Sequence, residues 1–207
     1  FKPDSIKQSL NRSDAGEVLY IDELEPSGTA GGLRKMLTDP CFQGLLDDQK
    51  PLLVVQGDSV TDADFSAFAQ RHAANNALVT IGCQMVDEAD VHKFGIIVTD
   101  RSGEDGLSGR ITGFQEKPSR ELAKSRLGNT GFYLLSPKAY PLIRDIYAQH
   151  LAKAQEQARQ AGLPVPEETP FDFAHDIFPA ILERVQAIPA LGDFRAETVA
   201  GYWSDIG

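Results

Sequence analysis

Short apolar runs that alternate with helix-forming stretches constrain the fold of this chain more than any other feature of its sequence. The apolar run at 52–55 ends at Gly57 and Asp58, which is typical of a buried strand that stops at a tight turn. By the same reasoning, further strands are predicted at 78–85, 94–98, 110–115 and 129–135, and helices at 65–76, 138–161 and 176–183. Strands that alternate with helices predict a three-layer α/β domain with a mixed sheet.

Two helix boundaries carry specific signals. Thr61 precedes Asp64 by three residues, a capping-box spacing that predicts the start of the helix at 65–76. Gly162 and Pro164 follow the helix at 138–161 and predict where it ends.

The length and charge of the chain exclude several classes of protein. Its 207 residues suit one domain, which we expect to span 1–207. Thirty acidic residues against 20 basic ones give a net charge of −10, which argues against a nucleic-acid partner. No apolar run approaches the roughly 20 residues of a membrane-spanning helix, and the first ten residues lack the apolar stretch of a secretory signal. The sequence leaves both a monomer and a homo-oligomer open.

The two cysteines, Cys41 and Cys83, are too few for a disulfide framework and match no zinc pattern. Cys83 lies in an apolar stretch, where a free cysteine acts as a small buried hydrophobic residue. Free cysteines predict a reducing compartment, the cytoplasm.

Asp58 is the first candidate site residue, because ligands of α/β sheets bind beyond the carboxyl ends of the strands. A carboxylate at this place suits Mg²⁺, which takes one or two carboxylates together with substrate phosphates. The alternative is that Gly57 and Asp58 only form a turn.

Asp62 and Asp64 form a D-x-D triplet, which is typical of glycosyltransferases that hold the metal of a sugar nucleotide. The triplet also opens a predicted helix, where carboxylates cap free backbone amides. We favour the capping role and keep the metal-dependent glycosyltransferase as an alternative.

Three further segments could contact a ligand. The glycine-rich segment 27–33, with Gly28 and Thr29, lets a flat ligand approach the backbone, although such a segment is more often just a turn. Glu116 and Lys117 follow the predicted strand at 110–115 and could contact sugar hydroxyls and phosphate, or form a solvated charge pair. The last segment, 201–207, pairs two aromatic residues with Asp205.

The order of these motifs along the chain is more specific than any one of them. The series runs E-x-E-P-x-G-T-A-G-G-L, V-V-x-G-D, F-x-E-K-P, N-x-G-F-Y-x-x-S-P, D-I-F-P and G-Y-W-x-D-I-G. It resembles the sugar nucleotidylyltransferases of the mannose-1-phosphate guanylyltransferase and glucose-1-phosphate thymidylyltransferase type, the former in particular, over about 5–207. The resemblance implies a three-layer, Rossmann-like mixed sheet of the glycosyltransferase-A type. It also implies a transfer that joins a sugar 1-phosphate to a nucleoside triphosphate (NTP) and releases pyrophosphate.

The resemblance also assigns roles to individual residues. Asp58 and Asp205 match the two aspartates that hold the catalytic Mg²⁺, and Lys117 matches the lysine on the sugar phosphate. Sugar contacts are implied for Glu116 and Asn129, and contacts around the base for the segment that holds Glu23, Pro26, Gly28 and Thr29.

Glu23 predicts which base is bound. An ionised carboxylate only accepts hydrogen bonds, and guanine offers two adjacent donors, N1–H and the 2-amino group. Uracil and thymine offer one donor flanked by acceptors. We therefore expect GTP with mannose 1-phosphate or a related sugar phosphate; in the alternative, Glu23 faces solvent and the backbone around Gly28 reads the base.

The glycine-rich phosphate loop of the family has no counterpart in this sequence, because Phe1 matches a position after it. A longer chain would supply that loop. The rival hypothesis is a non-catalytic subunit that binds sugar nucleotides and regulates a partner enzyme.

Overall fold

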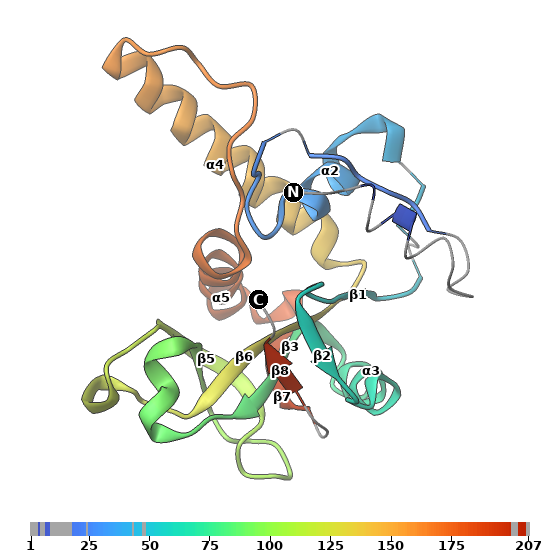
Figure 1. The fold of residues 1–207 in the computed structure, drawn as a ribbon, viewed down its shortest axis with the longest axis vertical. Coiled ribbons are helices and arrows are strands. Elements are labelled where there is room, and N and C mark those ends of the chain that lie inside the picture. Colours follow the sequence, from blue (N-terminus) through green and yellow to red (C-terminus); the bar gives the residue numbers. More distant parts are fainter. Residues whose placement is uncertain are drawn as a thin grey trace.

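A computed structural model describes residues 4, 7–8, 18–23, 25–42, 44–46, 49–199 and 203–205, the last three through their backbone only. The helices are α2 (Gly31–Thr38), α3 (Phe65–Ala74), α4 (Ala139–Ala161) and α5 (Phe178–Ala187), with a π-helical turn at Phe173–Ile177 directly before α5 (Figure 1). The strands are β1 (Leu52–Val54), β2 (Ser59–Thr61), β3 (Ala77–Met85), β4 (Gly95–Thr99), β5 (Gly109–Glu116), β6 (Leu127–Leu135), β7 (Asp193–Thr198) and β8 (Trp203–Asp205). Short 3₁₀ turns lie at Pro40–Phe42, Glu88–Lys93, Arg120–Leu122 and Pro189–Leu191.

Six strands form one mixed sheet in the order β1-β6-β3-β7-β5-β4. Strands β3 and β7 run parallel, whereas the other pairs are antiparallel, and the first residues of β6 also pair with β4. Strands β2 and β8 form a separate antiparallel ladder. The predicted mixed α/β sheet is therefore confirmed.

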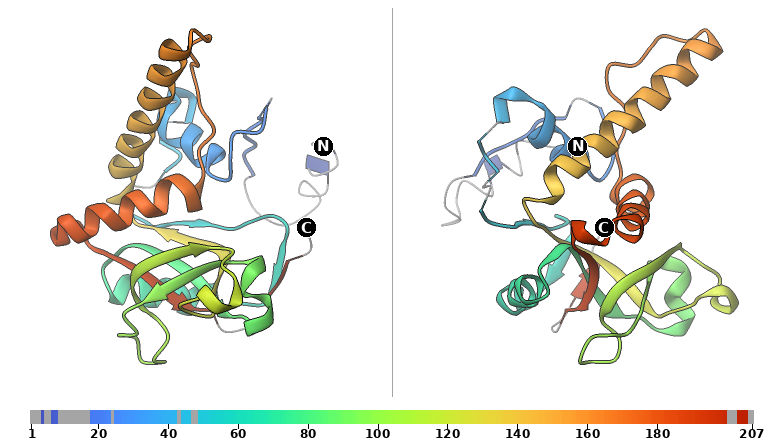
Figure 2. Two further views of the ribbon diagram at one scale, coloured as in Figure 1. Left: turned by 90° about the vertical axis from the view of Figure 1, so that its left-hand side faces the viewer. Right: turned by 180° about the vertical axis from the view of Figure 1, so that it is seen from behind.

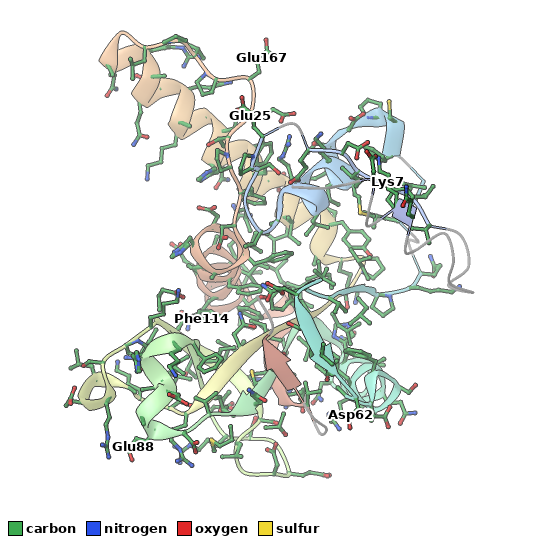
Figure 3. The ribbon with its side chains drawn as sticks, in the orientation of Figure 1. Lys7, Glu25, Asp62, Glu88, Phe114 and Glu167 are labelled. Atoms are coloured by element: carbon green, nitrogen blue, oxygen red, sulfur yellow. The ribbon has the colours of Figure 1, made fainter. Side chains whose placement is uncertain are left out.

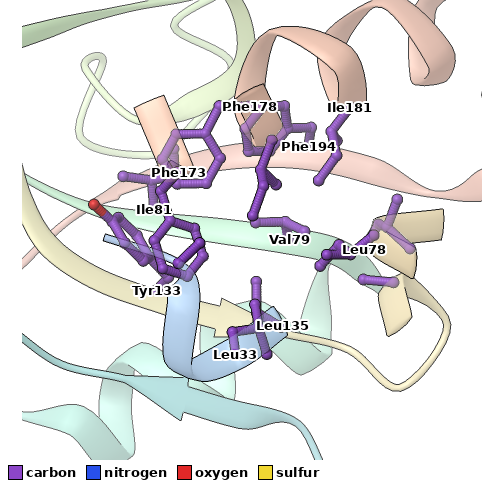
Figure 4. Packing of buried hydrophobic residues seen from close by; sticks show 14 of the residues in the cluster. Leu33, Leu78, Val79, Ile81, Tyr133, Leu135, Phe173, Phe178, Ile181 and Phe194 are labelled. Atoms are coloured by element: carbon purple, nitrogen blue, oxygen red, sulfur yellow. The ribbon is translucent and has the colours of Figure 1, made fainter. Parts of the chain in front are cut away.

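Helices cover the sheet on two sides (Figures 1 and 2). On one side, Phe178 and Ile181 of α5 pack against Val79 of β3 and Phe194 of β7, and all four side chains are buried (Figure 4). On the other side, α3 contacts β3, where the buried His72 ring bonds the Thr80 hydroxyl at 2.8 Å. Burial lowers the pKa of His72 to about 4, so the ring is neutral at pH 7.

The start of α3 differs from the prediction in its capping residue. The Asp64 carboxylate, not the Thr61 hydroxyl, caps the helix by accepting a hydrogen bond from the Ala67 amide at 2.9 Å. Thr61 Oγ1 instead accepts from the Ala63 amide at 3.0 Å, which shapes the turn before the helix. The favoured role of Asp64 as a helix cap is confirmed, and Figure 3 shows Asp62 beside this helix start.

The end of α4 follows the prediction. Gly162 adopts the left-handed conformation with φ of 67°, and its amide bonds the Arg159 carbonyl at 3.2 Å.

Several elements differ from the predictions. Strand β1 forms at the predicted place, but it is an edge strand with Leu53 38% exposed, so its predicted burial was wrong. Strand β7 was not predicted, because it carries charged residues; Arg195 and Glu197 are nonetheless buried, with 3.3 Å between Arg195 Nε and Glu197 Oε1. Helix α2 begins inside the glycine-rich segment, at Gly31.

Cys83 is fully buried and burial raises the pKa of its thiol, which confirms its role as a small core residue. Among the described residues, no helix is both long and apolar enough to cross a membrane.

Candidate active site

A hollow of about 540 Å³ lies beyond the end of β1. It is lined by Thr29, Val54, Val55, Gln56, Gly57, Asp58, Tyr133 and Phe173. Asp58 thus reaches this hollow from the turn that follows the strand, as expected for a ligand site at a strand end.

The β2–β8 ladder brings the second motif of the series, which ends at Asp58, next to the last motif. Ser59 pairs with Asp205, and Thr61 pairs with Trp203. Figure 1 shows the two strands β2 and β8 side by side. Because Asp58 directly precedes Ser59, the backbone of Asp205 pairs with the residue next to Asp58. The side chain of Asp205 lies outside the described residues, so the convergence of the two carboxylates stays a prediction.

The described part of the site offers one carboxylate, Asp58, to a metal ion. Within the described residues, no group of three His, Cys, Asp or Glu side chains could hold a metal. Mg²⁺ keeps several waters and binds through one or two carboxylates plus substrate phosphates, so the Asp58 carboxylate at an open hollow is a ligand of the kind that it takes, and Asp205 stays the predicted second ligand.

Thr29 connects the glycine-rich segment to the start of the π-helical turn. Its hydroxyl donates to Asp172 Oδ2 at 2.6 Å and accepts from the Phe173 amide at 3.1 Å. Partial burial raises the pKa of Asp172, but hydrogen bonds from Thr29 and from the His175 and Ala174 amides outweigh it and hold that pKa below its usual range. Asp172 is therefore ionised at neutral pH and fixes one wall of the hollow.

Gly28 has a structural reason to be glycine. Its φ is +85°, and a Cβ atom built there would lie 2.3 Å from the Phe171 carbonyl oxygen. A hydrogen bond joins the glycine-rich segment to Phe171, because the Ala30 amide donates to the Phe171 carbonyl oxygen at 2.9 Å.

Replacing Gly28 by Ala is expected to lower the free energy of unfolding by more than about 2 kcal/mol, because of the left-handed backbone and the clash. Gly32 is the matched control: a Cβ there meets nothing within 4 Å, so Gly32→Ala should be neutral or stabilising by up to about 1 kcal/mol. Urea unfolding of both variants measures the difference. Equal urea midpoints for Gly28→Ala and Gly32→Ala would contradict the expected clash at Gly28.

Glu23 and Pro26 line a different hollow, of about 310 Å³, together with Glu25, Ser27, Arg34, Lys35, Glu168, Thr169 and Pro170. Ser27 Oγ donates a hydrogen bond to Glu23 Oε1 and so orients the carboxylate. The two hollows share no lining residue; the segment from Pro26 to Thr29 connects them.

Glu116 and Asn129 line one small pocket of about 40 Å³, with Phe114 and Phe178 among its other residues. Asn129 Nδ2 donates to the Tyr133 hydroxyl at 3.0 Å, and Asn129 Oδ1 accepts from the Gly131 amide at 3.0 Å. Burial raises the pKa of Tyr133 to about 12, so its hydroxyl stays protonated. Tyr133 also lines the Asp58 hollow and thereby connects it to this pocket.

Lys117 lies beside this pocket but does not line it. Its Nζ is 3.9 Å from Glu116 Oε1, and its side chain is 63% exposed. The backbone of Lys117 is left-handed, with φ of 42°, and its amide bonds the Phe94 carbonyl at 3.2 Å.

Gln56, Tyr133 and Phe173 are site residues that the sequence analysis did not single out. Gln56 stands directly before Gly57, and its side chain lies over Gly131: a Cβ at Gly131 would be 2.4 Å from Gln56 Oε1. Tyr133 and Phe173 lie in or next to motifs of the series, which was the available signal; that their rings pack 4.8 Å apart depends on the tertiary structure.

Comparison with known proteins decides the family. The family model described as "Nucleotidyl transferase" matches residues 1–207. The chain belongs to the nucleotidyl transferase family. The resemblance found in the motif series is thereby confirmed.

Curated relatives of this chain carry three different base specificities in their names. A glucose-1-phosphate adenylyltransferase of Thermosipho africanus is 31% identical, over 96% of this chain and 41% of the relative. A UTP–glucose-1-phosphate uridylyltransferase of Synechocystis is 29% identical, over 87% and 36%. A mannose-1-phosphate guanyltransferase of Candida albicans is 29% identical, over 100% and 46%. The chain thus spans less than half the length of these relatives.

Among solved structures, a UDP-glucose pyrophosphorylase of Acinetobacter baumannii aligns with a TM-score of 0.64 and 18% identity. The alignment covers 99% of this chain and 61% of that one. At this identity the similarity establishes the fold, which is the fold of the nucleotidyl transferase domain.

Proposed function

We propose that the protein containing this chain joins a sugar 1-phosphate to an NTP and forms a nucleotide-sugar and pyrophosphate. The observation that supports the proposal is the pairing of Ser59 with Asp205, because Ser59 directly follows Asp58, and Asp58 lines the open hollow. The names of the relatives support it, since they all describe transfer to a sugar 1-phosphate.

In this reaction an oxygen of the sugar phosphate attacks the α-phosphorus of the NTP, and the bond to pyrophosphate breaks. Both reactants are anions, so the main tasks of the protein are positioning and charge neutralisation. Mg²⁺ held by Asp58 and Asp205 would supply positive charge next to the phosphate oxygens. Lys117 would bind the sugar phosphate, because its exposed ammonium group extends beside the pocket.

The sugar would be bound by Glu116 and Asn129, which share one pocket. The Glu116 carboxylate accepts hydrogen bonds from hydroxyl groups. Asn129 is held in place by Tyr133 and Gly131, so its orientation costs little entropy on binding.

For the base we propose a preference for guanine, and therefore GTP with mannose 1-phosphate. Pro26, Gly28 and Thr29 would form the backbone around the base, and Glu23 would accept from guanine N1–H and the 2-amino group. A carboxylate has about four lone-pair sites, so the bond from Ser27 leaves acceptor capacity on Glu23. We place the reaction in the cytoplasm, in keeping with the two free cysteines.

An assay of the full-length protein with ATP, GTP, UTP and dTTP tests the proposal. We expect kcat/KM for GTP to exceed the others by about tenfold or more, and Glu23→Gln to remove most of that preference, since each charged hydrogen bond contributes about 1.5–3 kcal/mol. Glu25→Gln is the matched control, because Glu25 lines the same hollow and has no assigned role.

Equal or better use of UTP or dTTP would overturn the guanine assignment while leaving nucleotidyl transfer intact. Nucleotide-sugar binding without transfer from any NTP would instead favour the non-catalytic regulatory subunit.

A further inference from the structure

Thr198, the last residue of β7, is held by hydrogen bonds at three of its polar atoms. Its hydroxyl donates to Asp105 Oδ2 at 2.6 Å, and its amide donates to Ser108 Oγ at 3.0 Å. Its carbonyl accepts from Arg71 Nη2 at 3.0 Å. Two segments, the loop before β5 and helix α3, thus converge on one strand end.

The loop that carries Asp105 is itself ordered by hydrogen bonds. Asp105 Oδ1 accepts from the amides of Leu107 and Ser108 at 2.9 and 2.7 Å, and Oδ2 also accepts from the Ser108 hydroxyl at 2.6 Å. Although partial burial raises the pKa of Asp105, these bonds and the bond from Thr198 outweigh it and hold the pKa well below its usual range. Asp105 is therefore a charged, pre-oriented acceptor for Thr198.

Arg71 connects the end of β7 to the chain segment that follows Asp58. It lies on α3, and its Nε is 3.5 Å from Oε2 of the buried Glu197. Helix α3 follows β2, which begins directly after Asp58, whereas β7 leads to β8, which ends at Asp205. The two chain segments that carry the aspartates therefore meet twice, at the β2–β8 ladder and at the contact of Arg71 with Thr198.

The contact of Arg71 with Thr198 matters because the β2–β8 ladder is short. Strands β2 and β8 have three residues each, and an isolated two-stranded ladder is at best marginally stable in water. Residues 199–202 alone separate Thr198 from β8. The Val199 amide donates a hydrogen bond to the Cys83 carbonyl at 2.8 Å, so the chain stays hydrogen-bonded to β3 for one residue beyond Thr198.

We propose that Arg71, Asp105, Ser108 and Thr198, here called the Thr198 cluster, position Asp205 against Asp58 for metal binding. These are positioning residues that act through β8 and do not touch the metal or the substrates. The proposal rests on the proposed function through its assignment of the two aspartates to Mg²⁺.

The test compares Thr198→Val, which keeps the shape but removes the hydroxyl, with Thr198→Ser, which keeps the hydroxyl. In the full-length protein, we expect Thr198→Val to weaken Mn²⁺ binding, measured by electron paramagnetic resonance, by about tenfold. The Mg²⁺ concentration for half-maximal activity should rise by a similar factor. Amide hydrogen exchange at 203–205 should also accelerate by about tenfold, and Thr198→Ser should stay within about twofold of the parent in all three measurements.

Thr112→Val is the matched control, because the Thr112 hydroxyl bonds the Val98 carbonyl at 3.2 Å on an exposed strand position. It should change none of the three measurements. If Thr198→Val does not fold, Ser108→Ala, which removes a donor to Asp105 and the acceptor of the Thr198 amide, replaces it with the same expectation.

Unchanged metal binding and unchanged exchange at 203–205 in Thr198→Val would overturn the proposal, even if thermal stability falls. A parent protein that binds Mn²⁺ but transfers no nucleotide would overturn the proposed function alone. A parent protein without Mn²⁺ binding would overturn the metal assignment and, with it, this inference.

Discussion

Replacement of Asp58 by Asn is expected to lower kcat for nucleotidyl transfer by about 10³-fold, or about 4 kcal/mol of transition-state stabilisation. Asparagine keeps the size of the side chain and one acceptor oxygen but removes the negative charge that would hold Mg²⁺. Asp58 is the carboxylate that lines the hollow of about 540 Å³, next to the residue that pairs with Asp205. Steady-state kinetics of the full-length protein with saturating NTP, sugar phosphate and Mg²⁺ measure the effect.

The control for this variant is Asp62→Asn, four positions further along the chain. We expect it to retain activity within about threefold, because Asp62 lies beside the start of α3 and does not line the hollow (Figure 3). Full activity of Asp58→Asn together with loss of activity in Asp62→Asn would reverse the assignment. That outcome would favour a metal site at the D-x-D triplet, as in the glycosyltransferase alternative.

Replacement of Phe178 by Ala is expected to lower the free energy of unfolding by about 3–5 kcal/mol. The Phe178 side chain is 1% exposed and is surrounded by four aromatic rings. Ring centroids lie 4.9 Å away for Tyr133, 5.6 Å for Phe173, 5.7 Å for Phe194 and 5.8 Å for Phe114. Urea unfolding followed by circular dichroism measures the loss as a lower midpoint at an unchanged slope.

The loss of packing at Phe178 should also affect the candidate site, because Phe178 and Phe114 line the pocket of Glu116 and Asn129. Leu122→Ala serves as the control, since this side chain is 69% exposed and its truncation should cost less than about 0.5 kcal/mol. A cost below about 1 kcal/mol for Phe178→Ala would show that the aromatic cluster contributes little to stability.

Local sequence patterns predicted the elements whose formation depends on neighbours along the chain. The apolar stretches of β3 and β6 predicted both strands to within two residues, because burial of apolar side chains drives strand formation there. Gly162 predicted the end of α4, since only a residue that tolerates a left-handed backbone ends a helix in this way. Asp58 was predicted as a ligand site from its place at the end of a strand together with the resemblance of its motif to the family.

Local sequence patterns failed to predict the elements that are stabilised by contacts with distant parts of the chain. Strand β7 carries Arg195 and Glu197, charged residues that a local pattern predicts to be exposed to solvent. They can be buried because they pair with each other and because Glu197 also contacts Arg71. Strand β2 is too short to carry a periodic signal. The helix predicted at 176–183 runs from Phe178 to Ala187, because a π-helical turn capped by Asp172 precedes it.

The sequence by itself therefore determined the mixed α/β class, the family and the order of the motifs, because each of these depends on residue types and spacing. Only the tertiary structure decided which motifs share a site. It brought Glu116 and Asn129 into one pocket, left Lys117 beside it, and separated Glu23 from the hollow of Asp58. The physical reason is that strand pairing and side-chain packing join residues far apart in the chain, as Ser59 joins Asp205, and no local pattern encodes such a partner.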